Sequence, residues 1–321
     1  MKDDLSAAAQ ATEDGYAIRA KGLRKSFGDV VAVDGLELEV KKGEIFGLVG
    51  PDGAGKTTTM RLLTGIMNPD AGQAEVAGFD VFRQPEALKP HIGYMPQRFS
   101  LYGDLTVAEN LYFFAKVYHV PDSERIQREK ELLAFSRLEP FRKRLGQHLS
   151  GGMKQKLALA CTLIHTPKVL FLDEPTTGVD PVSRRDFWKI LYSLLKEGVT
   201  LFVSTPYMDE AERCNRVALM DKGRIVICDT PDALKQRMRG ELLEVIAEPL
   251  RTAKQIIASL PGVLEVQVFG DRMHVWVEDA AKAEPLLTAA LSEKGIGVEG
   301  LRRTVPGLED VFISLVAGGK R

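Results

Sequence analysis

The chain has 321 residues, of which 45% are hydrophobic and 27% charged, so it is long enough for one large core and a smaller second one. Its 43 Lys and Arg residues nearly balance its 44 Asp and Glu residues, and this balance gives no support to a nucleic-acid partner, which usually calls for a basic face. No apolar stretch reaches the roughly 20 residues that span a bilayer. The three scattered cysteines predict free thiols in a reducing cytoplasm.

The first half of the chain alternates strand and helix patterns. Residues 1–17 are acidic, rich in alanine and featureless, and we expect a disordered tail there. The continuous apolar run Ile45–Val49 predicts a buried strand, and apolar residues at helical spacing follow it over residues 57–67. From about residue 98 to residue 150 the patterns predict a helical insert.

Strand patterns return after this insert. Apolar runs at residues 169–172, 200–204 and 217–220 are interleaved with helical segments, which indicates an α/β sheet. We therefore predict an α/β domain over residues 18–238.

The pattern changes beyond residue 239 and predicts a small second domain that continues to residue 321. Its elements follow the order strand, helix, strand, strand, helix, strand, with Gly270 and Asp271 as a two-residue hairpin loop. This order suggests a ferredoxin-like α+β fold.

The segment from Gly50 to Thr57 fits the phosphate-loop pattern of Gly, four residues, and Gly-Lys-Thr. Gly50, Gly53 and Gly55 are expected to take positive φ and so to turn backbone N–H groups toward an anion, and the helix that follows presents its positive end. Lys56 supplies a charge for the terminal phosphates of ATP, and Thr57 supplies a hydroxyl for Mg²⁺. Asp52 is a departure that adds a negative charge beside the phosphates, with a side chain that points to solvent as the favoured alternative. The predicted nucleotide contacts of this loop are Gly50, Pro51, Asp52, Gly53, Ala54, Gly55, Lys56, Thr57 and Thr58.

Two carboxylates, Asp173 and Glu174, directly follow the apolar run at residues 169–172. This places them at the carboxyl end of a buried strand, where ligands of open α/β sheets bind. Adjacent strand residues face opposite ways, so the two carboxylates are expected to do different jobs. A solvated acidic turn is the alternative.

A third motif, Ser150-Gly151-Gly152, opens a helical segment. Serine is a good N-cap and the glycines leave N–H groups accessible, so this segment is a second candidate for anion binding. Taken alone, it would more often be a plain helix cap.

The order of the three motifs resembles that of the nucleotide-binding subunit of ABC transporters, over roughly residues 18–238. The resemblance makes residues 149–152 the signature segment, which contacts the γ-phosphate held by an opposite subunit. It implies that Asp173 holds Mg²⁺ through water and that Glu174 orients and polarises the attacking water.

The resemblance also assigns roles to isolated residues. Phe27 would stack on adenine, with core packing as the alternative. Gln97 would bridge Mg²⁺ and the helical insert, and Asp180 would lie at the subunit contact. The implied catalytic residues are Glu174, Lys56 and Gln97, and the implied metal ligands are Thr57, Gln97 and Asp173.

Position 206 departs from the family pattern. Pro206 stands where the family normally has a histidine that touches the γ-phosphate, and proline has neither a side-chain donor nor a backbone N–H. Loss of one such donor typically costs about 3 to 4 kcal/mol of transition-state stabilisation. We expect slowed but real hydrolysis, with Thr205 or Tyr207 as substitute donor. The alternative is a degenerate site beside an intact second ATPase domain.

The function implied by the resemblance is that of an ATP-hydrolysing motor subunit at the cytoplasmic side of the membrane. It would form a homo- or heterodimer with a second ABC-type ATPase subunit and drive separate integral membrane permease subunits that dock on the helical insert. The residues after Pro206 and the extra C-terminal domain resemble exporting members. Two alternatives stay open: a soluble ABC-type ATPase without a membrane partner, and a regulatory ATP-binding subunit with little turnover.

Overall fold

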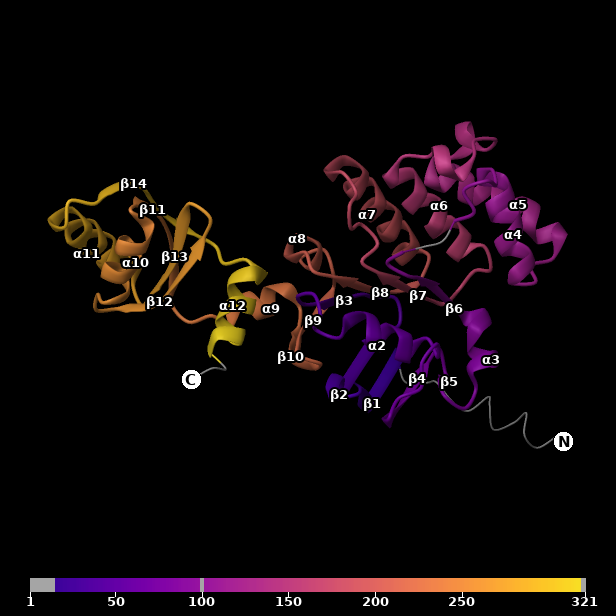
Figure 1. Cartoon of the computed structure of the whole chain (residues 1–321), viewed down its shortest axis with the longest axis horizontal. Helices are drawn as coiled ribbons and strands as arrows, with labels where there is room; N and C mark the ends of the chain where they lie inside the picture. The colour runs from indigo at the N-terminus through magenta and orange to yellow at the C-terminus, as the bar shows by residue number, and fades with distance from the viewer. Residues whose placement is uncertain (1–14, 99–100, 319–321) are drawn as a thin grey trace. The chain divides into compact units, whose positions relative to one another are not determined.

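The computed structural model describes residues 15–98 and 101–318 and divides into two compact units, residues 1–228 and 229–321 (Figure 1). Most of the predicted disordered tail lies outside the described residues, but the prediction extends too far, because Tyr16 already begins a strand. The predicted domain boundary at residue 238 stays a prediction. Among the described residues Cys161, Cys214 and Cys228 form no disulfide, as expected. Among the residues that the structure describes, no helix has both the length and the apolar character needed to cross a bilayer.

An antiparallel sheet opens the first unit, in the order β2-β1-β4-β5. In β2 the buried residues Leu36, Leu38 and Val40 alternate with exposed Glu37 and Glu39, because only one face of this sheet meets the core. The four strands are β1 (Tyr16–Phe27), β2 (Val30–Lys41), β4 (Ala71–Val76) and β5 (Phe79–Asp80).

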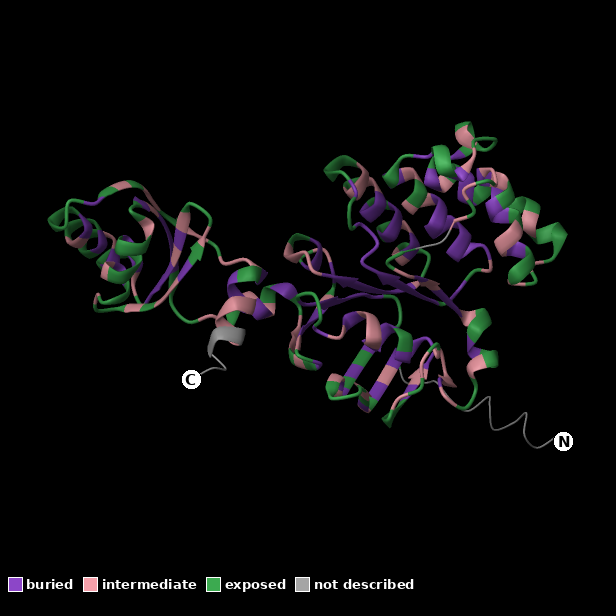
Figure 2. Cartoon of the chain, viewed as in Figure 1, coloured by how far each residue is buried: buried purple, intermediate pink, exposed green. Residues whose placement is uncertain are grey.

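The second sheet of this unit has the order β10-β9-β3-β8-β7-β6, and its central pairs are parallel. Every residue of β3, β7 and β8 is buried, as the continuous apolar runs predict for parallel strands covered on both faces (Figure 2). Their carboxyl ends therefore meet at one edge. The strands are β3 (Ile45–Val49), β6 (Ile92–Met95), β7 (Val169–Asp173), β8 (Thr200–Thr205), β9 (Arg216–Asp221) and β10 (Arg224–Asp229).

The predicted helical insert is present between β6 and β7. Its first long helix, α4, begins at a capping box in which Thr106 and Glu109 bond each other's backbone N–H groups. The helices and 3₁₀ turns of the first unit are α2 (Lys56–Leu63), α3 (Pro85–Leu88), η1 (Lys89–His91), α4 (Val107–Val117), α5 (Asp122–Ser136), η2 (Glu139–Phe141), η3 (Gly146–His148), α6 (Gly151–Leu163), α7 (Pro181–Lys196) and α8 (Met208–Ala211).

The second unit contains the predicted ferredoxin-like order of elements, and its antiparallel sheet has the order β12-β13-β11-β14. Leu243, Val275 and Leu287 belong to its apolar core. Trp276 breaks the strand alternation yet is buried as well. The elements are α9 (Pro231–Gln236), β11 (Glu241–Glu248), α10 (Leu250–Ala258), β12 (Val263–Phe269), β13 (Arg272–Val277), α11 (Ala280–Glu293), β14 (Gly297–Thr304) and α12 (Leu308–Gly318).

Candidate nucleotide-binding site

The phosphate loop joins buried strand β3 to helix α2. Gly55 is the N-cap of α2 with a φ of 106°, in the left-handed region that only glycine adopts readily. Gly50 is needed for a different reason from the predicted one. Its φ is not positive, and a Cβ there would lie 2.2 Å from the carbonyl oxygen of Met220. The loop therefore requires glycine both for its turn and for its close packing on β9.

A cavity of about 410 Å³ lies against this loop. Among the predicted contacts, Gly50, Pro51 and Ala54 do not line it, and the N–H of Ala54 already donates to the carbonyl of Pro51 at 3.2 Å. The structure thus gathers most, but not all, of the predicted loop contacts in one place. The lining residues are Phe27, Ala32, Asp52, Gly53, Gly55, Lys56, Thr57, Thr58, Gln97 and Glu174.

Phe27 reaches this cavity from the end of β1. Its side chain is 48% exposed, so the alternative of core packing does not hold. The ammonium of Lys25 lies 5.9 Å from the centre of the ring. An exposed ring beside a phosphate loop offers a flat apolar face to a nucleobase.

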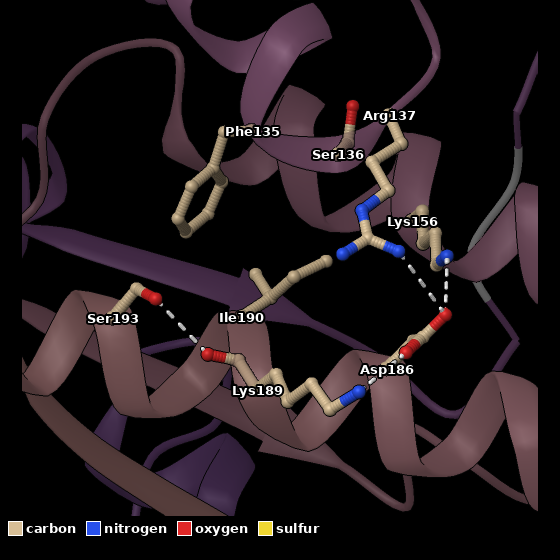
Figure 3. A pocket seen from close by; sticks show the side chains of 8 residues that line it. All are labelled: Phe135, Ser136, Arg137, Lys156, Asp186, Lys189, Ile190 and Ser193. Atoms are coloured by element: carbon tan, nitrogen blue, oxygen red, sulfur yellow. Dashed lines mark hydrogen bonds and ion pairs between the residues drawn. The ribbon is translucent and has the colours of Figure 1, made fainter.

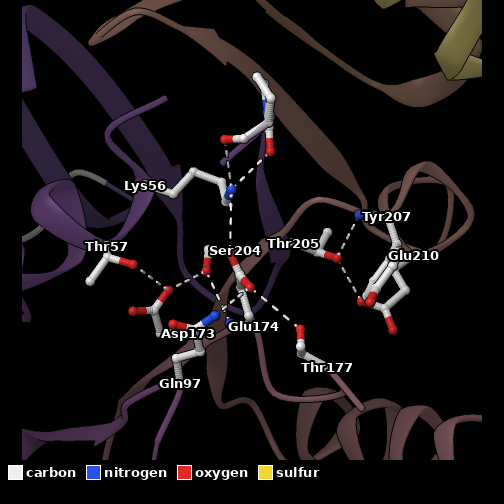
Figure 4. Close-up of polar contacts among 12 residues, drawn as sticks. Lys56, Thr57, Gln97, Asp173, Glu174, Thr177, Ser204, Thr205, Tyr207 and Glu210 are labelled. Carbon is white, nitrogen blue, oxygen red and sulfur yellow. Dashed lines mark hydrogen bonds and ion pairs between the residues drawn. The ribbon is translucent and has the colours of Figure 1, made fainter. Parts of the chain in front are cut away.

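Lys56 is buried, and its ammonium lies among three oxygens (Figure 4). It donates to the carbonyl oxygens of Gly50 at 2.8 Å and Pro51 at 3.0 Å, and it forms an ion pair with Glu174 Oε1 at 3.3 Å. These contacts satisfy a charge that would otherwise be costly to bury. A phosphate that approaches Lys56 has to compete with the Glu174 carboxylate.

Glu174 is 7% exposed and has a φ of 49°, which is strained for a residue other than glycine. Its backbone N–H donates to the carbonyl and to the hydroxyl of Ser204, both at 3.1 Å. Its Oε2 accepts a hydrogen bond from Gln97 Nε2 at 2.9 Å and one from Thr177 at 3.4 Å. Gln97 therefore contacts the predicted catalytic carboxylate directly.

Asp173 Oδ1 accepts hydrogen bonds from Ser204 at 2.6 Å and from Thr57 at 3.2 Å. Its second oxygen, Oδ2, is buried and has no hydrogen-bond partner among the described residues. A buried carboxylate oxygen left free beside a threonine hydroxyl matches the oxygen ligands and bound waters that Mg²⁺ prefers. The predicted pair Thr57 and Asp173 therefore fits a magnesium ion.

Ser204 is a residue that the sequence reasoning missed. It is fully buried in β8, and the parallel register of β7 and β8 places it opposite Asp173. The available signal was a polar residue at the end of an otherwise apolar strand. Tyr94 on β6 lies near the same carboxylate, since burial and then the charge of Asp173 raise the pKa of its phenol to about 12.

The signature segment is separate from the cavity that holds Lys56. Ser150 caps α6 by accepting a hydrogen bond from the N–H of Met153 at 3.3 Å. Gly152 packs on α7 so closely that a Cβ there would lie 2.6 Å from the side chain of Ser183. Neither Ser150 nor Gly151 nor Gly152 lines the cavity of this chain.

Asp180 caps the start of α7 and is exposed. Hydrogen bonds from Ser183, by its side chain and its N–H, hold the pKa of this carboxyl below its usual value. The structure therefore places Asp180 next to the signature helix rather than beside Lys56.

A cavity of about 120 Å³ lies where α5, α6 and α7 meet (Figure 3). Asp186 of α7 forms ion pairs there with Lys189 at 3.2 Å, Arg137 at 3.7 Å and Lys156 at 3.9 Å. The hydrogen bond from Lys189, followed by the charge of Lys156, lowers the pKa of this carboxyl. These contacts tie the signature helix to the helix that Asp180 caps.

The two residues expected as substitute donors beside Pro206 have other neighbours in this structure. Thr205 donates its hydroxyl to Glu210 Oε2 at 2.8 Å. The ring of Tyr207 lies under the Arg184 guanidinium at 4.5 Å and beside Glu210, away from Lys56 (Figure 4). The expectation that one of them substitutes for the imidazole stays a prediction.

The phosphate loop, the two carboxylates after β7 and the signature at the start of α6 together define an ABC-type ATPase cassette. The family model described as ABC transporter matches residues 33–177, and the model described as the C-terminal domain of DrrA1-3-like ATP-binding proteins matches residues 230–316. The chain belongs to the family of ABC transporter ATP-binding proteins.

Two relatives and one solved structure illustrate this membership. The chain is 44% identical over 305 residues to the probable multidrug ABC transporter ATP-binding protein YbhF of Escherichia coli (strain K12), covering 94% of this chain and 52% of that protein. It thus spans about half the length of that relative. It is 39% identical over 310 residues to the daunorubicin resistance ATP-binding protein DrrA2 of Streptomyces coeruleorubidus, covering 94% of this chain and 95% of that protein.

The solved structure is a dimeric ATP-binding cassette in a post-hydrolysis state, bound to ADP and Pi. It superimposes on this chain with a TM-score of 0.60 at 25% identity, covering 66% of this chain and 98% of that chain.

Proposed function

We propose that this chain is the ATP-hydrolysing motor subunit of an exporter and that it works at the cytoplasmic side of the membrane. The observation that carries the proposal is the meeting of Lys56, Thr57, Gln97 and Glu174 at one cavity, with Asp173 bonded to Thr57. Two relatives named for multidrug transport and for daunorubicin resistance support the assignment to export.

Each polar residue of the cavity has a distinct role in this proposal. Lys56 binds the terminal phosphates and offsets their charge. Glu174 holds the attacking water and accepts its proton, and Gln97 keeps the Glu174 carboxylate oriented. Thr57 and Asp173 would hold Mg²⁺, which when bound neutralises charge on the phosphate oxygens.

A second cassette completes the site in this proposal. Ser150, Gly151 and Asp180 are exposed and lie outside the cavity of their own chain, so they are free to face the nucleotide of another subunit. The N-terminus of α6, with Ser150 as its cap, would then present its N–H groups to the partner's γ-phosphate. The solved dimeric cassette bound to ADP and Pi supports the pairing of two cassettes. Both a homodimer and a heterodimer are compatible with it.

A groove of about 850 Å³ is the proposed docking site for the permease. It is lined from one side by the segment after α2 and from the other by the ends of α4 and α6. Ile66 and Val117 are exposed there, and the ring of Tyr118 stacks on that of His165 with 3.8 Å between centroids. Exposed apolar side chains around aromatic rings suit a short helix from a membrane subunit.

Replacement of Ile66 by glutamate is expected to detach the membrane subunit. Ile66 is 61% exposed in the groove, and a carboxylate there would have to be buried without a partner on docking. Capture of the tagged chain from detergent-solubilised membranes should yield at least about tenfold less polytopic protein.

The matched control for this experiment is Val226→Glu, because Val226 is 44% exposed on β10, outside the groove. It should capture the membrane subunit as the wild type does. If the wild type brought down only soluble partners, the chain would instead be a soluble ABC-type ATPase.

Replacement of Pro206 by histidine is expected to raise kcat at least about tenfold, because it restores a donor near the γ-phosphate. The comparison variant is Pro206→Ala, which restores the backbone N–H without the imidazole. Steady-state phosphate release measures both. An unchanged rate in Pro206→His would mean that position 206 does not limit hydrolysis.

A further inference from the structure

Helix α8 carries a carboxylate, Glu210, that is fully buried and does not line the cavity beside Lys56. Each of its two oxygens accepts a hydrogen bond from a threonine hydroxyl: Oε1 from Thr176, and Oε2 from Thr205 at 2.8 Å (Figure 4). The Arg184 guanidinium supplies a countercharge, with its Nε 3.6 Å from Oε1. A buried carboxylate whose two oxygens both accept hydrogen bonds has a fixed position, and it also fixes the positions of the side chains that donate to it.

The two threonines belong to the segments that carry the reaction. Thr176 comes two residues after Glu174, and Thr205 directly precedes Pro206. The backbone ladder between β7 and β8 ends at the pair formed by Asp173 and Ser204. Beyond that pair β7 ends, whereas Thr205 stays in β8 and pairs with Val49 of β3. Glu210 therefore joins Thr176, which follows β7, to the last residue of β8 by side-chain hydrogen bonds. One carboxylate therefore links the segment after β7 to the end of β8 at the edge of the sheet that carries Asp173 and Glu174.

Arg184 connects the same carboxylate to helix α7. Its guanidinium lies over the ring of Tyr207 at 4.5 Å and 3.8 Å from Asp209, and it is situated one turn after the cap residue Asp180. The backbone N–H of Tyr207 donates to the Thr205 hydroxyl at 3.0 Å. The segment after Glu174, the loop at Pro206 and the start of α7 thus all meet at one buried side chain.

We propose that Glu210 is a positioning residue for ATP hydrolysis. By fixing Thr176 and Thr205, it sets the distance between the segment that carries Glu174 and the loop that carries Pro206. This inference rests on the proposed ATPase function. Loss of Glu210 should reduce turnover, because Thr176 and Thr205 are then no longer held. The affinity for ATP should stay unchanged, because Glu210 lines no part of the cavity. This chain has proline where the family has a histidine that touches the γ-phosphate, so the position of the loop at Pro206 depends on this bridge.

The test is Glu210→Gln in the full chain, purified with any membrane subunit that binds it. The amide keeps the size of the side chain but removes the charge facing Arg184 and one of the two strong acceptors. We expect kcat to fall about 10- to 100-fold, because small misplacements of catalytic groups lower the rate by such factors. The dissociation constant of a fluorescent ATP analogue should stay within about twofold, which separates positioning from binding.

Two control sets make the result specific. Asp209→Asn removes a charge near Arg184 from the same helix, but Asp209 is exposed and contacts neither threonine, so kcat should be unchanged. Thr176→Val removes one hydroxyl from the bridge, whereas Thr176→Ser keeps it. The valine variant should lose turnover and the serine variant should retain it, even if Glu210→Gln folds poorly.

The outcomes separate the two proposals. If wild type and Glu174→Gln were equally inactive, the ATPase function itself would fail. If the wild type hydrolysed ATP and the Glu210 and Thr176 variants did so at the same rate, only the positioning role would fail. A loss of ATP affinity that matched the loss of kcat, without rescue by Thr176→Ser, would make Glu210 a structural residue and overturn the inference.

Discussion

Replacement of Glu174 by glutamine is expected to lower kcat by about 10²- to 10⁴-fold, the usual effect of losing a general base. Glutamine keeps the shape of the side chain and its contact with Gln97, but its amide does not take up the proton of the attacking water. The change also removes the negative charge that lies 3.3 Å from Lys56. ATP should therefore bind at least as tightly as in the wild type, and steady-state phosphate release with an ATP titration measures both effects.

The matched control is Glu44→Gln, because Glu44 and Glu174 are both 7% exposed carboxylates of the first unit. Glu44 accepts hydrogen bonds from the N–H of Lys41 and from Arg216, outside the cavity. This variant should hydrolyse ATP at the wild-type rate. Equal and negligible rates in the wild type and in Glu174→Gln would instead identify a regulatory ATP-binding subunit.

Replacement of Lys56 by methionine is expected to abolish tight binding of ATP. The thioether fills the space of the lysine stem but supplies no charge to the phosphates, and it leaves the Glu174 carboxylate buried without its ion-pair partner. Loss of one partner from such a buried charged contact costs about 2 to 5 kcal/mol, or roughly 30- to 5000-fold in Kd. A fluorescent ATP analogue titrated against the chain measures this change.

Lys89→Met provides the comparison for this experiment, because Lys89 is an exposed lysine that pairs with Glu86 and lies outside the ATP cavity. Its Kd for the analogue should match that of the wild type. Binding of equal strength to Lys56→Met would show that the nucleotide does not use this loop.

The parts of the site that are formed by consecutive residues could be predicted from the sequence. The apolar run Ile45–Val49, the glycines after it and Lys56 form one uninterrupted strand, loop and helix, so pattern and structure coincide. The order of elements in the second unit was predictable for the same reason, since alternation and turn residues act over short distances.

Contacts that depend on the sheet order could not be predicted in this way. Ser204 contacts Asp173 only because β8 lies beside β7. The hydrogen bonds of Glu210 to Thr176 and Thr205 also require β7 and β8 to be neighbours. Nothing local to Gly50 indicates that the carbonyl of Met220 lies against it. The cap formed by Ser150 was predictable, but its separation from Lys56 follows from the tertiary fold.

The ion pair between Lys56 and Glu174 links binding of the nucleotide to activation of the catalytic carboxylate. The ammonium that must meet the phosphates is the same group that neutralises the base. A triphosphate that takes over Lys56 therefore sets the carboxylate free to attract a proton, so recognition and activation become one event. A nucleotide whose phosphates do not reach Lys56 leaves this ion pair intact, so the carboxylate stays neutralised and water is activated only when a triphosphate is bound.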